Sequence, residues 1–278
     1  MIVDTHAHVV SADEERYPRQ VTWLEVFRSL WEKPVTAELM ATEMDEARID
    51  RSLLVQPYSI YGFDSSYVVD SAARYPKRFA SVCSVDMVKP EAPQDLARWV
   101  ERGARGLRIF ANFPVVAEWL DDPKTFGVWQ RAEDRGIPVC VQMVQDQIPQ
   151  LRRVLGRFRK VQVVIDHLGG AKFDEGPPYR GLAPLFDLAQ FPNLLLKFST
   201  PSLNAAGKGR STPREAFSTL VECFGARKLM WGSNFPQTFD PPLKEQVELA
   251  KRRLAFLSKD DQRWLLGETA LTLWPELR

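Results

Sequence analysis

Residues 1–8 have the sequence Met1-Ile2-Val3-Asp4-Thr5-His6-Ala7-His8, a short β-branched run that ends in a His-x-His pair. Residues two apart in a strand point to the same face, so His6 and His8 are predicted to project together from one strand end. Two such imidazoles can hold a divalent metal ion, carry protons or donate hydrogen bonds to an anion. Taken alone, the pair is more typical of two hydrogen-bonded surface histidines, so the rest of the chain decides between these interpretations.

Seven further short apolar segments follow this first strand, and stretches with helical spacing alternate with them. The predicted strands are residues 52–56, 79–85, 104–110, 137–143, 161–167, 194–199 and 229–232. The predicted helices are residues 36–49, 66–75, 92–102, 123–135, 148–158, 182–191, 213–224, 242–256, 259–266 and 268–274. Strands this apolar are typical of a parallel sheet that is covered on both faces.

Eight strand-helix units in 278 residues predict the α/β class and a (β/α)₈ barrel, with residues 1–278 as a single domain. A doubly wound open sheet is the alternative. It would normally carry a glycine-rich turn after its first strand, where this chain has His-x-His. Residues 9–35 form a long connection, for which a lid over the barrel and a packed surface excursion are both open.

Composition excludes several classes of function. Lys+Arg 37 against Asp+Glu 36 leaves almost no net charge, so we expect neither nucleic-acid nor membrane-surface binding. No apolar run is long enough to cross a membrane, and we expect no signal peptide. The three cysteines, Cys83, Cys140 and Cys223, are interpreted as reduced core thiols of a cytoplasmic protein. A homo-oligomer is left open.

The active site of a (β/α)₈ barrel lies at the C-terminal ends of its strands, so the residues at those ends are the candidates. They are His6 and His8, Gln56 and Tyr58, Arg108, Gln142, His167, Ser199 with Lys197 before it, and Ser233 with Asn234. All three histidines of the protein fall in this set. Random placement would rarely produce that, and the pattern favours a catalytic site.

Several motifs, in this order, resemble those of the amidohydrolase superfamily, in its branch of lactonases. They are Asp4-Thr5-His6-Ala7-His8, Gly136-Ile137-Pro138-Val139, Val164-Ile165-Asp166-His167-Leu168-Gly169-Gly170, Leu229-Met230-Trp231-Gly232-Ser233-Asn234-Phe235-Pro236 and Gly267-Glu268-Thr269-Ala270. The likeness is greatest to 2-pyrone-4,6-dicarboxylate lactonases and to sugar-lactone and sulfomuconolactone hydrolases. It implies a barrel enzyme that hydrolyses a cyclic ester, with a small anionic lactone as substrate.

The metal content is left open between none and one divalent ion, Zn²⁺ or Mn²⁺, with His6 and His8 as ligands if a metal is bound. Many members of the superfamily place a lysine or carboxylate on strand four and a histidine on strand five. This chain has Arg108 and Gln142 there, so a binuclear site is not expected.

Asn234 stands where the family motif has the aspartate that acts as general base or acid. An amide has no proton acceptor that titrates near neutrality, whereas an ionised carboxylate is an acceptor. Three accounts stay open. The chain could be a variant inactivated to trap its substrate, a natural member that does not need this base, or a non-catalytic binder.

Opening a lactone requires deprotonation of water, stabilisation of an oxyanion and protonation of the leaving oxygen. His6, His8 and His167 are the candidates for stabilising the oxyanion. Arg108 could grip a substrate carboxylate or form a structural ion pair. The other candidates for substrate binding are Tyr58, Gln56, Gln142, Ser199, Arg180 and Arg210, although cations on loops are more often solvated.

Two aspartates are given opposite roles. Asp4 is expected on the face of His6 and His8, where it could orient a histidine. Asp166 is expected to point toward the helix layer as a structural residue. Lys197 is expected in the barrel interior or at the site. A metal-dependent decarboxylase of a cyclic acid, a phosphoesterase and a binding protein remain the rival functions.

Overall fold

The structure is a computed structural model that describes residues 1–20, 30, 32–112 and 116–278. Eight parallel strands form one sheet in the order β1 to β8. They are β1 (Val3–Ala7), β2 (Arg51–Val55), β3 (Phe79–Ser84), β4 (Gly106–Phe110), β5 (Val139–Gln142), β6 (Val163–Ile165), β7 (Leu194–Ser199) and β8 (Leu229–Gly232). A parallel bridge between Ala7 and Phe235 brings the end of β8 back to β1. The predicted (β/α)₈ barrel is confirmed.

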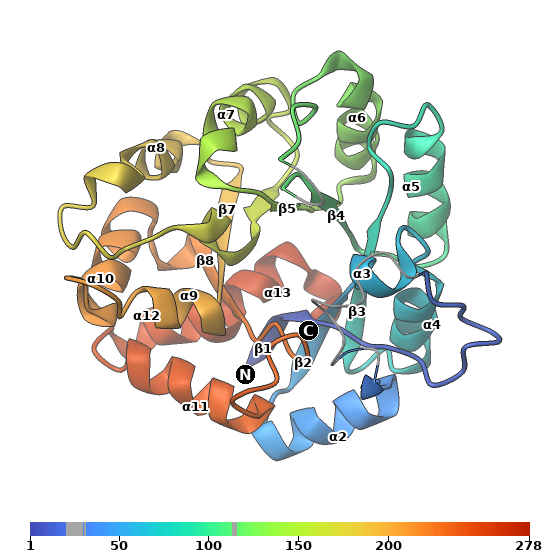
Figure 1. Cartoon of the computed structure of the whole chain (residues 1–278), viewed down its shortest axis with the longest axis horizontal. Helices are drawn as coiled ribbons and strands as arrows, with labels where there is room; N and C mark the ends of the chain where they lie inside the picture. The colour runs from blue at the N-terminus through green and yellow to red at the C-terminus, as the bar shows by residue number, and fades with distance from the viewer. Residues whose placement is uncertain (21–29, 31, 113–115) are drawn as a thin grey trace.

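Helices surround these strands, which occupy the middle of the view in Figure 1. The α-helices are α2 (Ala37–Ala47), α3 (Tyr58–Tyr61), α4 (Ser66–Arg74), α5 (Ala92–Glu101), α6 (Phe126–Arg135), α7 (Ile148–Arg157), α8 (Ala183–Phe186), α9 (Thr200–Ala205), α10 (Pro213–Phe224), α11 (Leu243–Leu254), α12 (Lys259–Arg263) and α13 (Thr269–Leu273). Local signals explain many of their ends. Thr36 caps α2 as expected, and Thr212 and Glu215 form a capping box at the start of α10.

Two short helices, α3 and α9, were not expected, and one expected helix is broken. Residues 182–191 form α8, only Ala183–Phe186, with single 3₁₀ turns on either side. The predicted helix over residues 259–266 continues past α12 as a π-helical turn, Trp264–Glu268. A side chain at Gly267 would meet the Met1 carbonyl oxygen at 2.6 Å, so the chain passes close to the N-terminus here.

The sheet separates two clusters of the apolar core. Residues that face outward from the strands, such as Val163 and Ile165, pack against the helices. Residues that face inward form a second cluster, which we call the barrel floor. It consists of Val3, Leu53, Val55, Ala80, Val82, Cys140, Val164, Leu195, Met230, Ala270, Leu271, Trp274 and Leu277. Trp274, after α13, is fully buried, and its indole N–H donates to the Arg105 carbonyl oxygen at 3.0 Å.

The proposed lid, residues 9–35, falls partly outside the described residues, including Trp23, Phe27 and Trp31. Its described flank packs on the barrel rim. Tyr17 lies in a buried cluster with Ile60 and Tyr61, and its hydroxyl donates to Asp70 at 2.8 Å. This flank is therefore a packed excursion, and lid function stays a prediction.

Cys223 corrects one expectation, because it is exposed on α10 whereas Cys83 and Cys140 are buried core thiols. Its position at the solvent face of the helix was not visible from the apolar residues around it in sequence. Within the described part of the chain, no helix is long and apolar enough to cross a membrane.

Candidate active site

The three histidines, which come from the ends of β1 and β6, lie together at the C-terminal end of the barrel. The His6 ring centroid is 5.0 Å from that of His8 and 4.5 Å from that of His167. His6 can approach β8 because Gly232 has no side chain. A Cβ there would lie 2.6 Å from His6 Cβ. The sequence therefore placed these three side chains correctly in one cluster.

The proton positions on His8 follow from its partner. His8 Nδ1 lies 2.8 Å from the Val55 carbonyl oxygen, which can only accept, so Nδ1 carries the proton. Burial lowers the pKa of His8 to about 3, so this imidazole is neutral near pH 7. Its Nε2 is then a lone-pair acceptor, and it is buried without a hydrogen-bond partner among the described residues.

Below the histidines lies a buried cluster of two cations and one carboxylate. Asp166 Oδ2 is 3.0 Å from Arg108 Nε, and Asp166 Oδ1 is 2.9 Å from Lys197 Nζ. Burial alone would raise the pKa of Asp166, but Lys197, His6 and Arg108 hold it well below its usual range. Lys197 therefore lies in the barrel interior, one of the two predicted positions. It forms an ion pair there with Asp166, in which both side chains are charged.

Asp166 corrects the expectation of a structural residue on the helix side. In a regular strand with His167 facing inward, the neighbouring Asp166 would face outward, toward the helices. Strand β6 instead ends at Ile165, with Val164 facing inward, so Asp166 continues the inward alternation. His167 reaches the same site because it adopts a left-handed conformation, with φ 53°. The sequence contained this signal in Gly169-Gly170, which favours a turn directly after the strand.

Asp4 also differs from expectation, because it orients no imidazole. Its carboxylate accepts hydrogen bonds from the Ser233 N–H at 2.8 Å, from the Ser233 hydroxyl at 2.6 Å and from the His6 backbone N–H at 3.0 Å. The register between β1 and β2 shifts between Asp4 and Ala7, which ends the simple alternation on which the expectation depended. Asp4 therefore ties β1 to the turn after β8.

Asn234 sits in that turn with φ 65°, a left-handed conformation that asparagine tolerates. Its backbone N–H donates to the His6 carbonyl oxygen at 2.7 Å, and its side-chain amide donates to the Thr238 hydroxyl at 3.0 Å. The amide also lies close enough to His8 to act on the pKa of that imidazole. Position 234 therefore belongs to the site, and it brings no carboxylate there.

A small cavity of about 40 Å³ opens beside this cluster. It is lined by His8, Leu30, Pro57, Tyr58, Ser59, Arg108, Phe110, Gln142 and Gln237. The volume suffices for water, but it lies far below the roughly 300–1,000 Å³ of a typical small-molecule pocket. Phe110 and Gln237 were not identified from the sequence. Phe110 is the last residue of β4, so the rule that selected the other strand-end residues could have identified it. Gln237 lies in the loop after β8, where no sequence pattern marks it as a cavity residue.

Arg108 forms the expected ion pair and also lines the cavity, whereas its role in gripping a substrate carboxylate stays a prediction. Its guanidinium pairs with Asp166, hydrogen bonds to the Gln142 side-chain oxygen, lies 4.4 Å over the Phe110 ring and also lines the cavity. Tyr58 stands at the same cavity, with its ring 4.8 Å from that of Phe110. These contacts bring Arg108, Gln142 and Tyr58 together, as the strand ends predicted.

The other residues predicted to bind substrate either lie away from the cavity or form hydrogen bonds within the protein. Gln56 is fully buried and its amide nitrogen donates to the carbonyl oxygens of Gly62 and Asp64. Ser199 lies 2.8 Å from His167 Nδ1 and so positions that ring. Arg180, in the 3₁₀ turn before α8, and Arg210 are exposed and do not line the cavity. Their use as substrate-binding residues stays a prediction.

A divalent metal ion needs several side-chain ligands that converge on one point. The buried, unpartnered Nε2 atoms of His6 and His8 would suit as two ligands. However, no group of three or more metal-ligating side chains converges among the residues that the structure describes. The Lys197 ammonium also lies only 3.4 Å from His6 Nδ1. These residues do not make up a complete metal site, and no step below depends on one.

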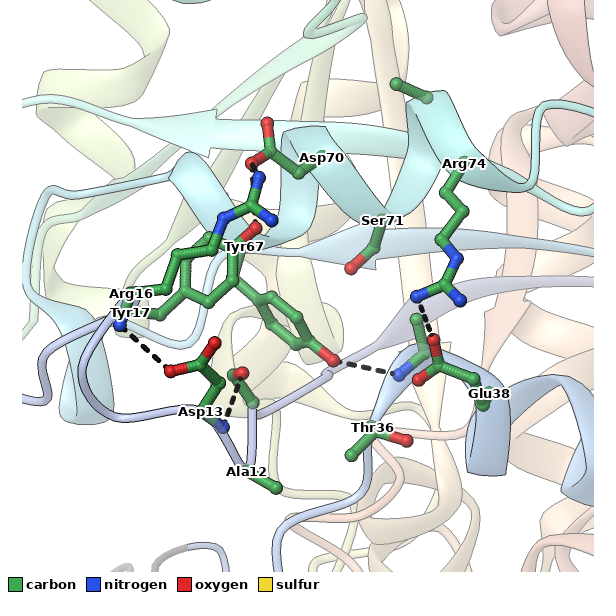
Figure 2. A pocket seen from close by; sticks show the side chains of 13 residues that line it. Ala12, Asp13, Arg16, Tyr17, Thr36, Glu38, Tyr67, Asp70, Ser71 and Arg74 are labelled. Carbon is green, nitrogen blue, oxygen red and sulfur yellow. Dashed lines mark hydrogen bonds and ion pairs between the residues drawn. The ribbon is translucent and has the colours of Figure 1, made fainter.

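A larger cavity, a cleft of about 560 Å³, lies between the 11–17 segment, the start of α2 and α4 (Figure 2). Its charged side chains pair with each other: Asp70 with Arg16, and Glu38 with Arg74. No histidine is among the side chains that line it. Its size alone therefore does not make it the site of chemistry.

Comparison with known proteins identifies the family and supports the barrel fold. The curated L-fucono-1,5-lactonase of Burkholderia ambifaria is 24% identical over 84% of this chain and 80% of that protein. The fold resembles a probable 2-pyrone-4,6-dicarboxylic acid hydrolase from Acinetobacter baumannii with citric acid bound (TM-score 0.80, 21% identity, 99% of each chain). It also resembles an amidohydrolase from Burkholderia multivorans with bound Zn (TM-score 0.80, 21% identity, 99% of each chain). Because the amidohydrolase family model matches residues 3–275, the chain belongs to the amidohydrolase family, as its motifs indicated.

Proposed function

We propose that this protein hydrolyses the ester bond of a lactone that carries an anionic group. The observation that carries the proposal is the cluster of three histidines beside the buried Arg108, at the end of the barrel where such folds place their chemistry. Family membership supports hydrolysis, and the L-fucono-1,5-lactonase relative and the pyrone-dicarboxylic acid hydrolase neighbour support a lactone. The cytoplasmic location expected from the sequence stays a prediction.

The roles follow from hydrogen-bonding capacity. The Arg108 guanidinium offers donors at the cavity wall to a substrate carboxylate. His8 Nε2 accepts the proton of the attacking water, because its Nδ1 is committed to Val55. The tetrahedral intermediate then collapses, the ring C–O bond breaks, and the leaving alkoxide takes the proton from His8. The product is a hydroxy acid.

This base is weak, because burial holds the pKa of His8 near 3. A carboxylate at position 234 would supply a stronger acceptor beside it. We therefore expect Asn234→Asp to raise the hydrolysis rate by about 10²–10⁴-fold, the usual contribution of a general base. This outcome would identify the present chain as a disabled or slow lactonase.

The experiment measures hydrolysis of pyrone-dicarboxylate, muconolactone-type and sugar lactones, L-fucono-1,5-lactone included, by the chain and by Asn234→Asp. Each assay is run with and without Zn²⁺ or Mn²⁺. Asn204→Asp, the same chemical change at an exposed position on α9, is the matched control and should leave the rate unchanged. A panel in which neither form hydrolyses any lactone contradicts the proposal.

Asn234 and the small cavity favour one second candidate, a non-catalytic binder of anionic lactones or their products. Calorimetric titration with the same compounds separates the two functions. Binding without turnover by Asn234→Asp would favour the binder. Carbon dioxide release from a cyclic acid would instead point to the decarboxylase that the sequence left open.

A further inference from the structure

Two groups of opposite charge lie near His6 Nδ1. The Lys197 ammonium nitrogen lies 3.4 Å away and the Asp166 Oδ1 atom lies 3.6 Å away. A hydrogen bond with Asp166 would require a proton on Nδ1, whereas a hydrogen bond with Lys197 would require a lone pair there. The hydrogen-bond partner of Nδ1 therefore determines which nitrogen of the His6 ring carries the proton.

The geometry favours Lys197. An ammonium group can only donate, and Lys197 is held beside His6 by its 2.9 Å ion pair with Asp166. Asp166 is already engaged by Arg108 and Lys197, and its 3.6 Å separation from Nδ1 is too long for a hydrogen bond. With Nδ1 as acceptor, the neutral His6 ring carries its proton on Nε2.

His8 is the opposite case, because the Val55 carbonyl oxygen can only accept and places the proton on Nδ1. The Nε2 atoms of both rings are buried and have no hydrogen-bond partner among the described residues. The two members of the His-x-His pair thus differ in what they offer. His6 offers a donor, and His8 offers an acceptor.

We propose that Lys197 is a positioning residue that holds His6 in the Nε2–H tautomer, so that His6 and His8 present one donor and one acceptor. Such a pair suits an oxygen species that accepts one hydrogen bond and donates another, such as water. It disfavours a divalent metal ion, which would require a lone pair on both nitrogens. The inference concerns the site of the proposed function, but its test needs no turnover, so the two can fail separately.

The experiment is a long-range ¹H–¹⁵N NMR spectrum of the full chain labelled with ¹⁵N-histidine at neutral pH. The protein has only three histidines, and His8→Gln and His167→Asn assign the signals. We expect His6 to show a protonated Nε2 and a bare Nδ1, and His8 to show the reverse. Two rings with the same tautomer, or a protonated Nδ1 on His6, overturn the proposal without any variant of Lys197.

Lys197→Met tests the cause, because it keeps the length of the side chain and removes the donor. Asp166 is then the remaining partner, and the His6 proton is expected to move to Nδ1 while His8 stays unchanged. Lys197→Arg keeps a donor and should retain the Nε2–H form. Lys228→Met is the matched control, since Lys228 donates to the Ala189 and Phe191 carbonyl oxygens and touches no histidine. A purely structural lysine would leave the tautomer in place.

Zn²⁺ titration by calorimetry gives a second readout. With the proton moved to Nδ1, His6 Nε2 becomes a ligand, so Lys197→Met should bind Zn²⁺ on the order of tenfold more tightly than the unchanged chain. The same affinity in both forms, or tighter binding by the unchanged chain, contradicts the proposed role of Lys197.

Discussion

The floor and the top of this barrel come from the same strands and have opposite chemistry. Along β6 and the residue after it, the inward residues are Val164 in the floor and Asp166 at the top, and on β7 they are Leu195 and then Lys197. Two residues along a strand thus separate an apolar layer from a buried ion-pair cluster. The lower layer stabilises the fold by burying apolar side chains, whereas the upper layer requires a partner for each buried charge.

A fall in pH should give the largest contrast, because only the top contains histidines. Burial lowers the pKa of His8 to about 3 and that of His167 to about 4, and it holds His6 well below the ordinary value. Between about pH 7 and pH 4 the unfolded chain therefore binds more protons, and the free energy of unfolding should fall by several kcal/mol. Burial raises the pKa of Asp4, which acts in the opposite sense.

Urea denaturation at a series of pH values measures this effect. His8→Gln should reduce the slope, because it removes one of the three groups. A free energy of unfolding that stays constant over the range would mean that the histidines are not buried in the neutral form.

Asp166→Ala should give the next largest effect. It leaves Arg108 and Lys197 buried without their carboxylate, and breaking a buried pair costs about 3–5 kcal/mol. Glu101→Ala is the control, because Glu101 forms an exposed ion pair with Arg135 and should contribute less than about 1 kcal/mol. Equal losses for the two variants would remove the distinction between the top of the barrel and its surface.

Met230→Ala tests the floor. Met230 is 1% exposed in the inner cluster, and its truncation should lower the free energy of unfolding by about 2–5 kcal/mol. The same measurement on Leu39→Ala, at a position 43% exposed on α2, should show almost no change. The dependence on pH should be retained in Met230→Ala, since the top layer is intact. A weaker pH dependence would show that the layers are coupled.

Arg108→Met should have the smallest effect of these variants. The effect concerns KM and is measured in the Asn234→Asp variant, which is expected to turn over substrate. Loss of the guanidinium should raise KM for an anionic lactone by about tenfold, roughly 1.4 kcal/mol, and leave KM for a neutral lactone almost unchanged. Initial-rate measurements of KM on one anionic and one neutral lactone test this expectation. An unchanged KM for both would assign Arg108 to the ion pair with Asp166 alone.

Much of the fold could be predicted because its signals are local. Apolar strands such as residues 194–199, and helix starts such as Thr212-Pro213, were placed at or near their observed bounds. The break in residues 182–191 was missed because an apolar pattern does not reveal where a helix divides into 3₁₀ turns. The convergence of His6, His8 and His167 was predictable, since strand ends of a parallel barrel share one rim.

The sequence by itself determined the eight-strand barrel, the family and the rim on which the histidines gather, because strand alternation and motif order are properties of the chain. Only the tertiary structure decided that Asp166 faces inward between Arg108 and Lys197, and that His6 and His8 have different partners. Charge state and hydrogen-bond direction depend on which groups from distant strands lie within a few ångströms in a medium without water. No local pattern contains that information.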